Sequence, residues 1–193
     1  MADAAIVSTA RTAIGKAYRG GFNDTDGPTL AAHAIANAVS RAGIEPAEVE
    51  DVVLGCAMPE GATGGNVARR GLIRAGLPAS VGGATIDRQC SSGLQAIAVA
   101  ARAVMFDGVA VAVAGGVESI SLVQNDKRNR FRAIDESLMA MKPEIYLPMI
   151  DTAEVVAARY GIGRDAQDAY GLESQRRTAA AQQAGRFAAE IVP

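Results

Sequence analysis

The sequence predicts an α/β domain followed by a mostly helical region. Short apolar runs that are typical of strands alternate with longer segments in which apolar residues recur at helical spacing. The strand runs are apolar throughout, which favours a sheet covered by helices on both faces. The predicted strands are residues 4–9, 49–56, 83–87 and 109–114, and the predicted helices between them are residues 28–42, 66–75 and 90–106.

The first two predicted helices carry their own start and stop signals. In residues 28–42, Ala, Leu, Ile and Val side chains recur on one face, and Gly43 suits the left-handed position that ends a helix. Asn66 is a favourable N-cap for the helix at 66–75, and Gly76 follows its last turn. In the helix at 90–106, helical spacing is carried by Leu94, Ile97, Ala98, Ala101, Val104 and Met105.

The character of the chain changes after Ser119. The segment that follows is polar and basic, then irregular, with two prolines. Two helices and the start of a strand are predicted beyond it, at residues 152–160, 164–184 and 190–193. We therefore expect an α/β domain at residues 1–119 and a partial helical domain at residues 120–193.

Composition excludes several classes of function. The 193 residues carry a net charge of −2, so nothing favours nucleic-acid binding. No apolar run is long enough for a transmembrane helix, and the first residues do not resemble a secretory signal. No metal-ligand pattern stands out, so no metal site is predicted. The only two cysteines lie in apolar settings, for which a reduced, cytoplasmic compartment is the simplest explanation.

Cys90 is the candidate catalytic residue. It follows a predicted strand and opens a predicted helix, within Asp87-Arg88-Gln89-Cys90-Ser91-Ser92-Gly93. A sulfur at a helix N-terminus lies near unpaired backbone N–H groups and the positive end of the helix dipole, which favours its thiolate. The alternative is that Cys90 is a small buried apolar residue, as Cys56 is expected to be.

Several separated motifs resemble the thiolase family. They are the Cys90 segment, Gly115-Gly116-Val117-Glu118-Ser119, Thr152-Ala153-Glu154 and the early Ala10-Arg11-Thr12 segment. The resemblance covers about the first half of a thiolase. It implies half of a layered fold, a mixed sheet covered by helices, with the beginning of the loop domain that covers coenzyme A.

The resemblance also implies chemistry. Cys90 would be the nucleophile that accepts an acyl group in thiolytic cleavage of 3-ketoacyl-CoA, or in the reverse Claisen condensation of acetyl-CoA. Thiolases take their catalytic histidines and second cysteine from their other half, which is absent here. We therefore expect a fragment, inactive without a C-terminal half or second chain, and exposing the surface meant for that half.

Coenzyme A is expected as a substrate, and no permanently bound cofactor is implied. Met149 matches the thiolase methionine that lies over the acyl and pantetheine region. Arg128 and Arg130, with Lys127 and Arg132, form a basic cluster that could attract the phosphates of coenzyme A. The alternative is a solvated loop, or one that packs on a neighbouring subunit of a homo-oligomer, either a dimer or a tetramer.

Two positions qualify the resemblance. Asp87 stands where many thiolases have Asn, and an unpaired carboxylate there would disfavour a nearby thiolate unless Arg88 compensates. Glu118 is expected to be a buried, hydrogen-bonded structural carboxylate rather than a general base. Two other functions remain open: a ketoacyl-synthase-like condensing enzyme, and a truncated or structural chain without catalysis.

Overall fold

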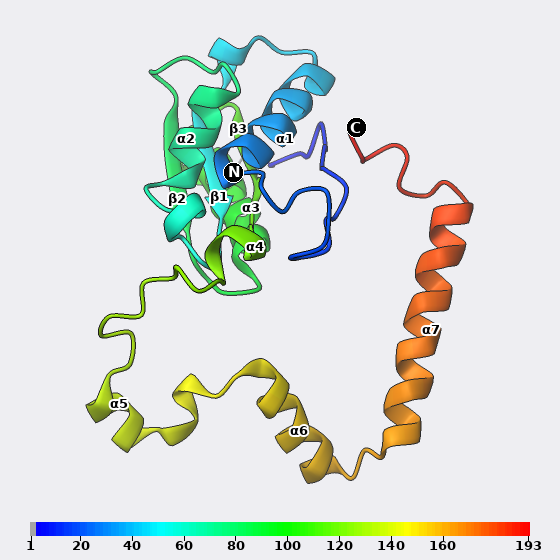
Figure 1. The fold of residues 1–193 in the computed structure, drawn as a ribbon. Coiled ribbons are helices and arrows are strands. Elements are labelled where there is room, and N and C mark those ends of the chain that lie inside the picture. The colour runs from blue at the N-terminus through cyan, green and yellow to red at the C-terminus, as the bar shows by residue number, and fades with distance from the viewer. Residues whose placement is uncertain (1–2) are drawn as a thin grey trace. The chain divides into compact units, whose positions relative to one another are not determined.

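The computed structural model describes residues 3–193 (Figure 1). The chain divides into two units. The first unit includes the chain up to Arg128 together with Glu190–Pro193, and the second is Asn129–Ala189. The domain boundary expected at Ser119 stays a prediction. Within the first unit, Tyr18 contacts the segment that follows Ser119. Its backbone N–H donates to Ser121 Oγ over 2.9 Å, and its hydroxyl donates to Gln124 O over 2.7 Å.

The first unit is built on a parallel sheet in the order β2-β1-β3. Its strands are β1 (Asp51–Gly55), β2 (Gly82–Ile86) and β3 (Ala112–Gly116). Val53 of β1 pairs in register with Ala84 on one side and Ala114 on the other. The central strand is the most buried of the three, as its continuous apolar run predicts. The α/β class is confirmed.

Two helices cover one face of the sheet. Helix α1 is Gly27–Ala42 and α2 is Val67–Arg74, with one-turn helices η1 (Pro46–Glu48) and η2 (Gly61–Thr63) in the connections. The predicted stop of α1 is confirmed, because Gly43 is left-handed with φ 69°. The side chains that join these helices to the sheet form one core cluster: Ala31, Ile35, Val39, Val49, Val52, Leu54, Ala68, Leu72, Leu77 and Val81.

Helix α3 (Ser92–Arg102) covers the opposite face and continues into a π-helical turn, η3 (Ala103–Asp107). Side chains alternate along a strand, so Val52 and Leu54 face the core cluster while Gly55 faces α3. The buried face of α3 carries Ser92, Ala96 and Ala100. The more prominent apolar spacing in the sequence lies elsewhere on the helix, and its first member, Leu94, is 73% exposed.

The prediction of a strand at residues 4–9 is wrong. The segment has no strand assignment, and Ile6 and Val7 are exposed. Its apolar composition suits a strand, but a strand also needs a ladder of backbone partners. Here Ser8 Oγ donates instead to Ala38 O of α1, and an isolated bridge between Arg11 and Ile191 follows the segment.

The second unit is helical. A short helix of the first unit, α4 (Ile120–Val123), precedes it in the chain. The helices of the second unit are α5 (Glu136–Met141), η4 (Pro143–Tyr146), α6 (Met149–Tyr160) and α7 (Arg164–Gln183). The two helices predicted from the sequence correspond to α6 and α7, and left-handed Gly161 ends α6. Among residues 3–193, no helix combines the length and the apolar character that crossing a membrane requires.

Candidate active site

Cys90 lies on the surface between β2 and α3. The strand ends at Ile86, the turn 87–90 follows, and Ser91 is the N-cap of the helix. Cys90 is exposed, whereas Cys56 is buried. The predicted placement at a strand-to-helix junction is confirmed, and the interpretation of Cys90 as a small buried apolar residue is wrong. Its role as a nucleophile stays a prediction.

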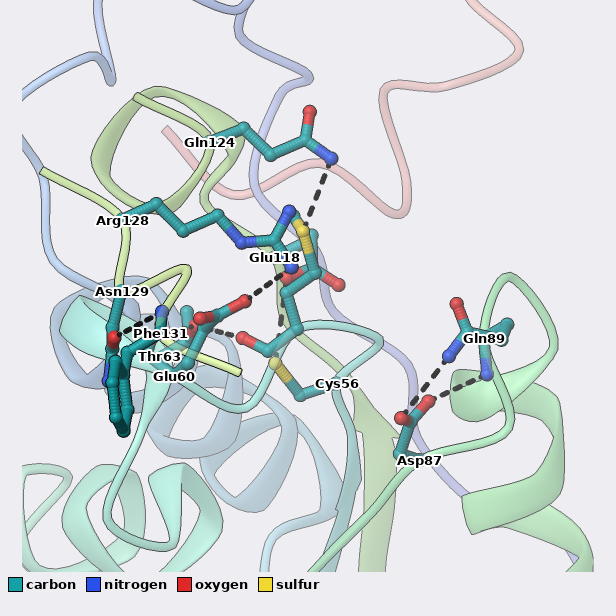
Figure 2. A network of polar contacts seen from close by, with 11 residues as sticks. Cys56, Glu60, Thr63, Asp87, Gln89, Glu118, Gln124, Arg128, Asn129 and Phe131 are labelled. Carbon is teal, nitrogen blue, oxygen red and sulfur yellow. Dashed lines mark hydrogen bonds and ion pairs between the residues drawn. The ribbon is translucent and has the colours of Figure 1, made fainter. Parts of the chain in front are cut away.

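Backbone and side-chain hydrogen bonds hold the turn before Cys90. Gln89 has a left-handed backbone with φ 50°, which for a residue with a side chain costs about 1–2 kcal/mol. Asp87 Oδ1 accepts from Gln89 N–H over 2.7 Å, and its Oδ2 lies 3.3 Å from the donating Gln89 Nε2 (Figure 2). Each such bond contributes about 0.5–1.5 kcal/mol, so a few of them offset the strain.

Ser92 closes the same turn from the other side. Its hydroxyl donates to Gln89 O over 2.6 Å and accepts from Arg88 N–H over 2.8 Å. The backbone N–H groups of Ser91 and Ser92 donate to Arg88 O and Gln89 O. These two donors at the start of α3 are therefore already engaged, and they are not among the unpaired N–H groups expected to surround the sulfur.

Asp87 and Arg88 do not form the compensating pair considered from the sequence. The Asp87 carboxylate is directed to Gln89, and the Arg88 guanidinium donates to Gln95 Oε1 on α3. The carboxylate is thus partnered within the turn, and its observed contacts stabilise the backbone next to Cys90.

Glycines allow α3 to begin directly over the ends of two strands. A Cβ on Gly55 would lie 2.1 Å from the carbonyl carbon of Ser92 and 2.4 Å from Gly93 N. A Cβ on Gly116 would lie 3.2 Å from the Cα of Gly93. The first turn of α3 therefore packs directly against the strand backbone. A larger residue at Gly55 would displace this turn. This contact fixes the height of the Cys90 turn above the sheet.

Glu118, which follows β3, is hydrogen-bonded to the segment that follows β1. Its carboxylate accepts from Ala57 N–H over 2.8 Å, and the Cys56 thiol donates to it over 3.5 Å (Figure 2). Burial, followed by the negative charge of Glu118, raises the pKa of the Cys56 thiol. The hydrogen bonds expected for Glu118 are confirmed, but the residue is half-buried rather than buried, and its structural role stays a prediction. The core position expected for Cys56 is confirmed, since that residue is only 1% exposed.

The residues expected to contact coenzyme A fall in different units. Arg128 belongs to the first unit, where its guanidinium lies 2.9 Å from a carboxylate oxygen of Glu60. Arg130 belongs to the second unit and is exposed. Met149 is the first residue of α6, also in the second unit, and is 70% exposed. Coenzyme A contacts at all three positions stay predictions.

No proton-transfer group accompanies Cys90 in the described contacts. His33, the only histidine in the sequence, lies in α1, and its Nε2 is 3.3 Å from Val192 O. No cluster of three or more His, Cys, Asp or Glu side chains in the described part of the chain could hold a metal ion.

Sequence reasoning missed the structural importance of Ser92 and Gly55. The sequence marks Ser92 only as part of the segment that opens the helix, yet it is 3% exposed with both hydrogen-bonding roles of its hydroxyl in use. A signal was present in the spacing of Ser92, Ala96 and Ala100, three small residues at i, i+4 and i+8. This spacing is typical of a helix face that approaches a sheet closely.

The fold and the site together define a class of protein. It is an α/β protein with an exposed cysteine at the N-terminus of a helix that packs on the sheet. The sequence profile of the thiolase N-terminal domain matches residues 4–193. The chain therefore belongs to the thiolase family.

Curated relatives support the same assignment. The chain is 40% identical over 193 residues to a 3-ketoacyl-CoA thiolase of Bacillus subtilis, covering 100% of this chain and 49% of that protein. It is 41% identical over 201 residues to an acetyl-CoA acetyltransferase of Chromobacterium violaceum, covering 99% and 51%. For a beta-ketoadipyl-CoA thiolase of Acinetobacter baylyi the values are 39% over 210 residues, 100% and 52%. The chain thus spans about half the length of these relatives.

Proposed function

We propose that this chain supplies the nucleophilic half of a thiolase active site, in which Cys90 carries an acyl group between 3-ketoacyl-CoA and coenzyme A. The observation that carries the proposal is the exposed Cys90 sulfur at the N-terminus of α3. Cysteine suits this step because its thiolate is both a strong nucleophile and a good leaving group. The names of the relatives, all thiolases or acetyltransferases that act on CoA esters, support the same chemistry.

In the proposed reaction, the Cys90 thiolate attacks the C3 carbonyl of 3-ketoacyl-CoA. The C2–C3 bond breaks, and its electron pair stays on C2, which takes a proton to give acetyl-CoA. The shortened acyl group remains on Cys90 as a thioester. The thiolate of coenzyme A then attacks that thioester, and the Cys90 thiolate leaves. Condensation of two acetyl-CoA molecules is the same sequence in reverse.

The proton transfers in this scheme require partners outside the described contacts of Cys90. A general acid or base must lie within hydrogen-bond reach of the proton that it moves, and His33 is committed to Val192 instead. We propose that these groups come from the part of the relatives' length that this chain does not span. We propose that such a half would cover exposed apolar side chains of this unit, among them Leu94 of α3 and Phe106 of η3.

The second unit is proposed to contribute to coenzyme A binding through Arg130 and Met149. Arg128 is also proposed to bind coenzyme A. It is the residue directly before the second unit, and it forms an ion pair with Glu60 of the first unit. We further propose a homo-oligomer in a reduced compartment, the cytoplasm. The two free cysteines support the choice of compartment, because disulfides form mainly in oxidising ones.

An acetylation experiment tests the proposed function. The chain is incubated with acetyl-CoA, alone and mixed with the complementary half of the Bacillus subtilis relative, and its intact mass is measured. We expect one acetyl group per chain in the mixture, its complete loss in Cys90→Ala and its retention in Cys56→Ala. No adduct in either sample, or an adduct that survives Cys90→Ala, would overturn the proposal.

A further inference from the structure

We infer that Ser92 is a positioning residue for Cys90, an inference that rests on the proposed role of Cys90 as nucleophile. Ser92 does not touch the substrate in this scheme. Its hydroxyl holds the turn before Cys90, and its backbone anchors that turn to the sheet. Together these contacts present the sulfur at the N-terminus of α3.

The contacts of the hydroxyl are specific to its position. It is buried inside the turn, where it accepts from Arg88 N–H over 2.8 Å and donates to Gln89 O over 2.6 Å. Gln89 O also accepts from Ser92 N–H over 3.0 Å. The residue directly before Cys90 is therefore bound through its carbonyl while its backbone stays left-handed. Without the hydroxyl, Arg88 N–H loses this acceptor, and the left-handed turn loses part of its support.

The backbone of Ser92 is fixed from below. Gly55 at the end of β1 leaves no space for a side chain between itself and the Ser92 carbonyl group. The position of Ser92 is thus set by the sheet, and the position of the turn is set by Ser92. Cys90 lies between Gln89 and Ser91, and both neighbours take part in these hydrogen bonds. The sulfur is held by its neighbours while remaining exposed.

Ser91 provides a matched control. It is adjacent to Cys90, has the same side chain and occupies the N-cap position, but its hydroxyl makes no capping hydrogen bond. It is also exposed, unlike Ser92. If any serine near the start of the helix served equally well, Ser91→Ala and Ser92→Ala would behave alike. The geometry assigns the role to Ser92 alone.

The test is the rate at which iodoacetamide alkylates Cys90 in the full chain. We expect Ser92→Ala to lower this rate about two- to fivefold, because the turn that presents the sulfur loses the hydrogen bonds of the Ser92 hydroxyl to Arg88 N–H and Gln89 O. Ser91→Ala should leave the rate unchanged, and Ser92→Thr, which keeps the hydroxyl, should restore it. Alkylation of buried Cys56 is measured in the same samples, because faster reaction there reports general loosening of the fold rather than loss of positioning.

Equal rates in the parent and Ser92→Ala, or an equal fall in Ser91→Ala, would overturn the inference. If Ser92→Ala unfolds the chain, amide hydrogen exchange in the parent decides. The Arg88 amide should be protected although Arg88 is exposed, since Ser92 accepts its hydrogen, and exchange at the rate of an open loop would refute the role. Alkylation requires no acyl transfer, so a failed acetylation experiment would remove the proposed function without altering this result.

Discussion

The two units of this chain differ in how their helices are held. In the first unit, α1, α2 and α3 enclose a sheet, and the core cluster joins residues that are far apart in the sequence. In the second unit no residue from 129 to 189 is buried, although α7 is the longest helix of the chain. Burial supports the first unit, and local interactions support the helices of the second.

Helix α7 shows what local interactions can do. Two ion pairs lie on its surface, Arg164 with Asp168 and Arg177 with Glu173. In each pair the two partners are about one helical turn apart. Such exposed pairs contribute only about 0.3–0.5 kcal/mol each. Isolated helices are marginal in water, since most helix stability in proteins comes from packing of one face. A given substitution should therefore change the free energy of unfolding more in the first unit than in the second.

The largest difference is expected for loss of a leucine side chain. Leu72 of α2 is 0% exposed within the core cluster, and Leu172 of α7 is 53% exposed. Leu72→Ala should lower the free energy of unfolding of the first unit by about 3–5 kcal/mol, because it removes apolar contacts and leaves a cavity. Leu172→Ala should change stability by less than about 0.5 kcal/mol. Urea titration followed by circular dichroism measures both, and similar losses would contradict the proposed division.

The next difference concerns glycine-to-alanine substitutions, which should destabilise the first unit and stabilise the second. Gly55→Ala places a methyl group within 2.1 Å of the Ser92 backbone and should destabilise the first unit by about 3 kcal/mol. Gly171 lies inside α7, where an added methyl group would have no atom within 4 Å, so Gly171→Ala should stabilise that helix by about 0.5–1 kcal/mol. Thermal unfolding and residue-resolved amide exchange measure these changes. A neutral Gly55→Ala would show that α3 does not rest on bare backbone.

The smallest effect concerns the N-cap of α1 and its pH dependence. Asp26 accepts from both Thr29 N–H and Thr29 Oγ1 over 2.8 Å, and these bonds hold the pKa of its carboxyl below the ordinary value of 3.8. Its contribution is therefore present above pH 3.8 and is lost as the pH falls through the lower folded-state pKa. At neutral pH, Asp26→Ala should cost about 1 kcal/mol.

The Asp26→Ala experiment includes its own pH control. Urea titrations of the parent and the variant at neutral and strongly acidic pH should show the stability difference shrinking on acidification. A difference that stays constant across that range would mean that the carboxylate charge plays no part in capping α1.

Most elements of the fold could be predicted from the sequence because their signals are local. Asn66 and Gly43 mark helix ends in the structure as they do in the sequence. The face of α3 could not be assigned from hydrophobicity, since Ala96 and Ala100 are buried while larger Leu94 is not. The buried face of α3 is the one with small side chains. Small side chains are needed there because the helix packs closely on Gly55 of β1, a residue distant in the sequence.

The candidate site was predictable only in outline. The position of Cys90 follows from the junction of two local patterns, a strand run and a helix start. The burial of Ser92 does not, because a serine near a helix start is usually interpreted as an exposed cap. In the same way, the apolar run at residues 4–9 predicts a strand, but pairing depends on an open ladder position that no local pattern reveals.

The chain returns to the first unit at Glu190, and this return has a consequence for how the molecule is made. Arg11 N–H donates to Glu190 O over 3.0 Å, and Val192 N–H donates to Arg11 O over 2.9 Å. Arg11 therefore cannot form these two hydrogen bonds until residues about 180 positions later in the chain have been synthesised. Contacts of such high sequence separation form slowly. The free-energy cost of closing the loop rises by only about 0.6 kcal/mol per doubling of the intervening length, so the second unit can become longer at little cost in stability.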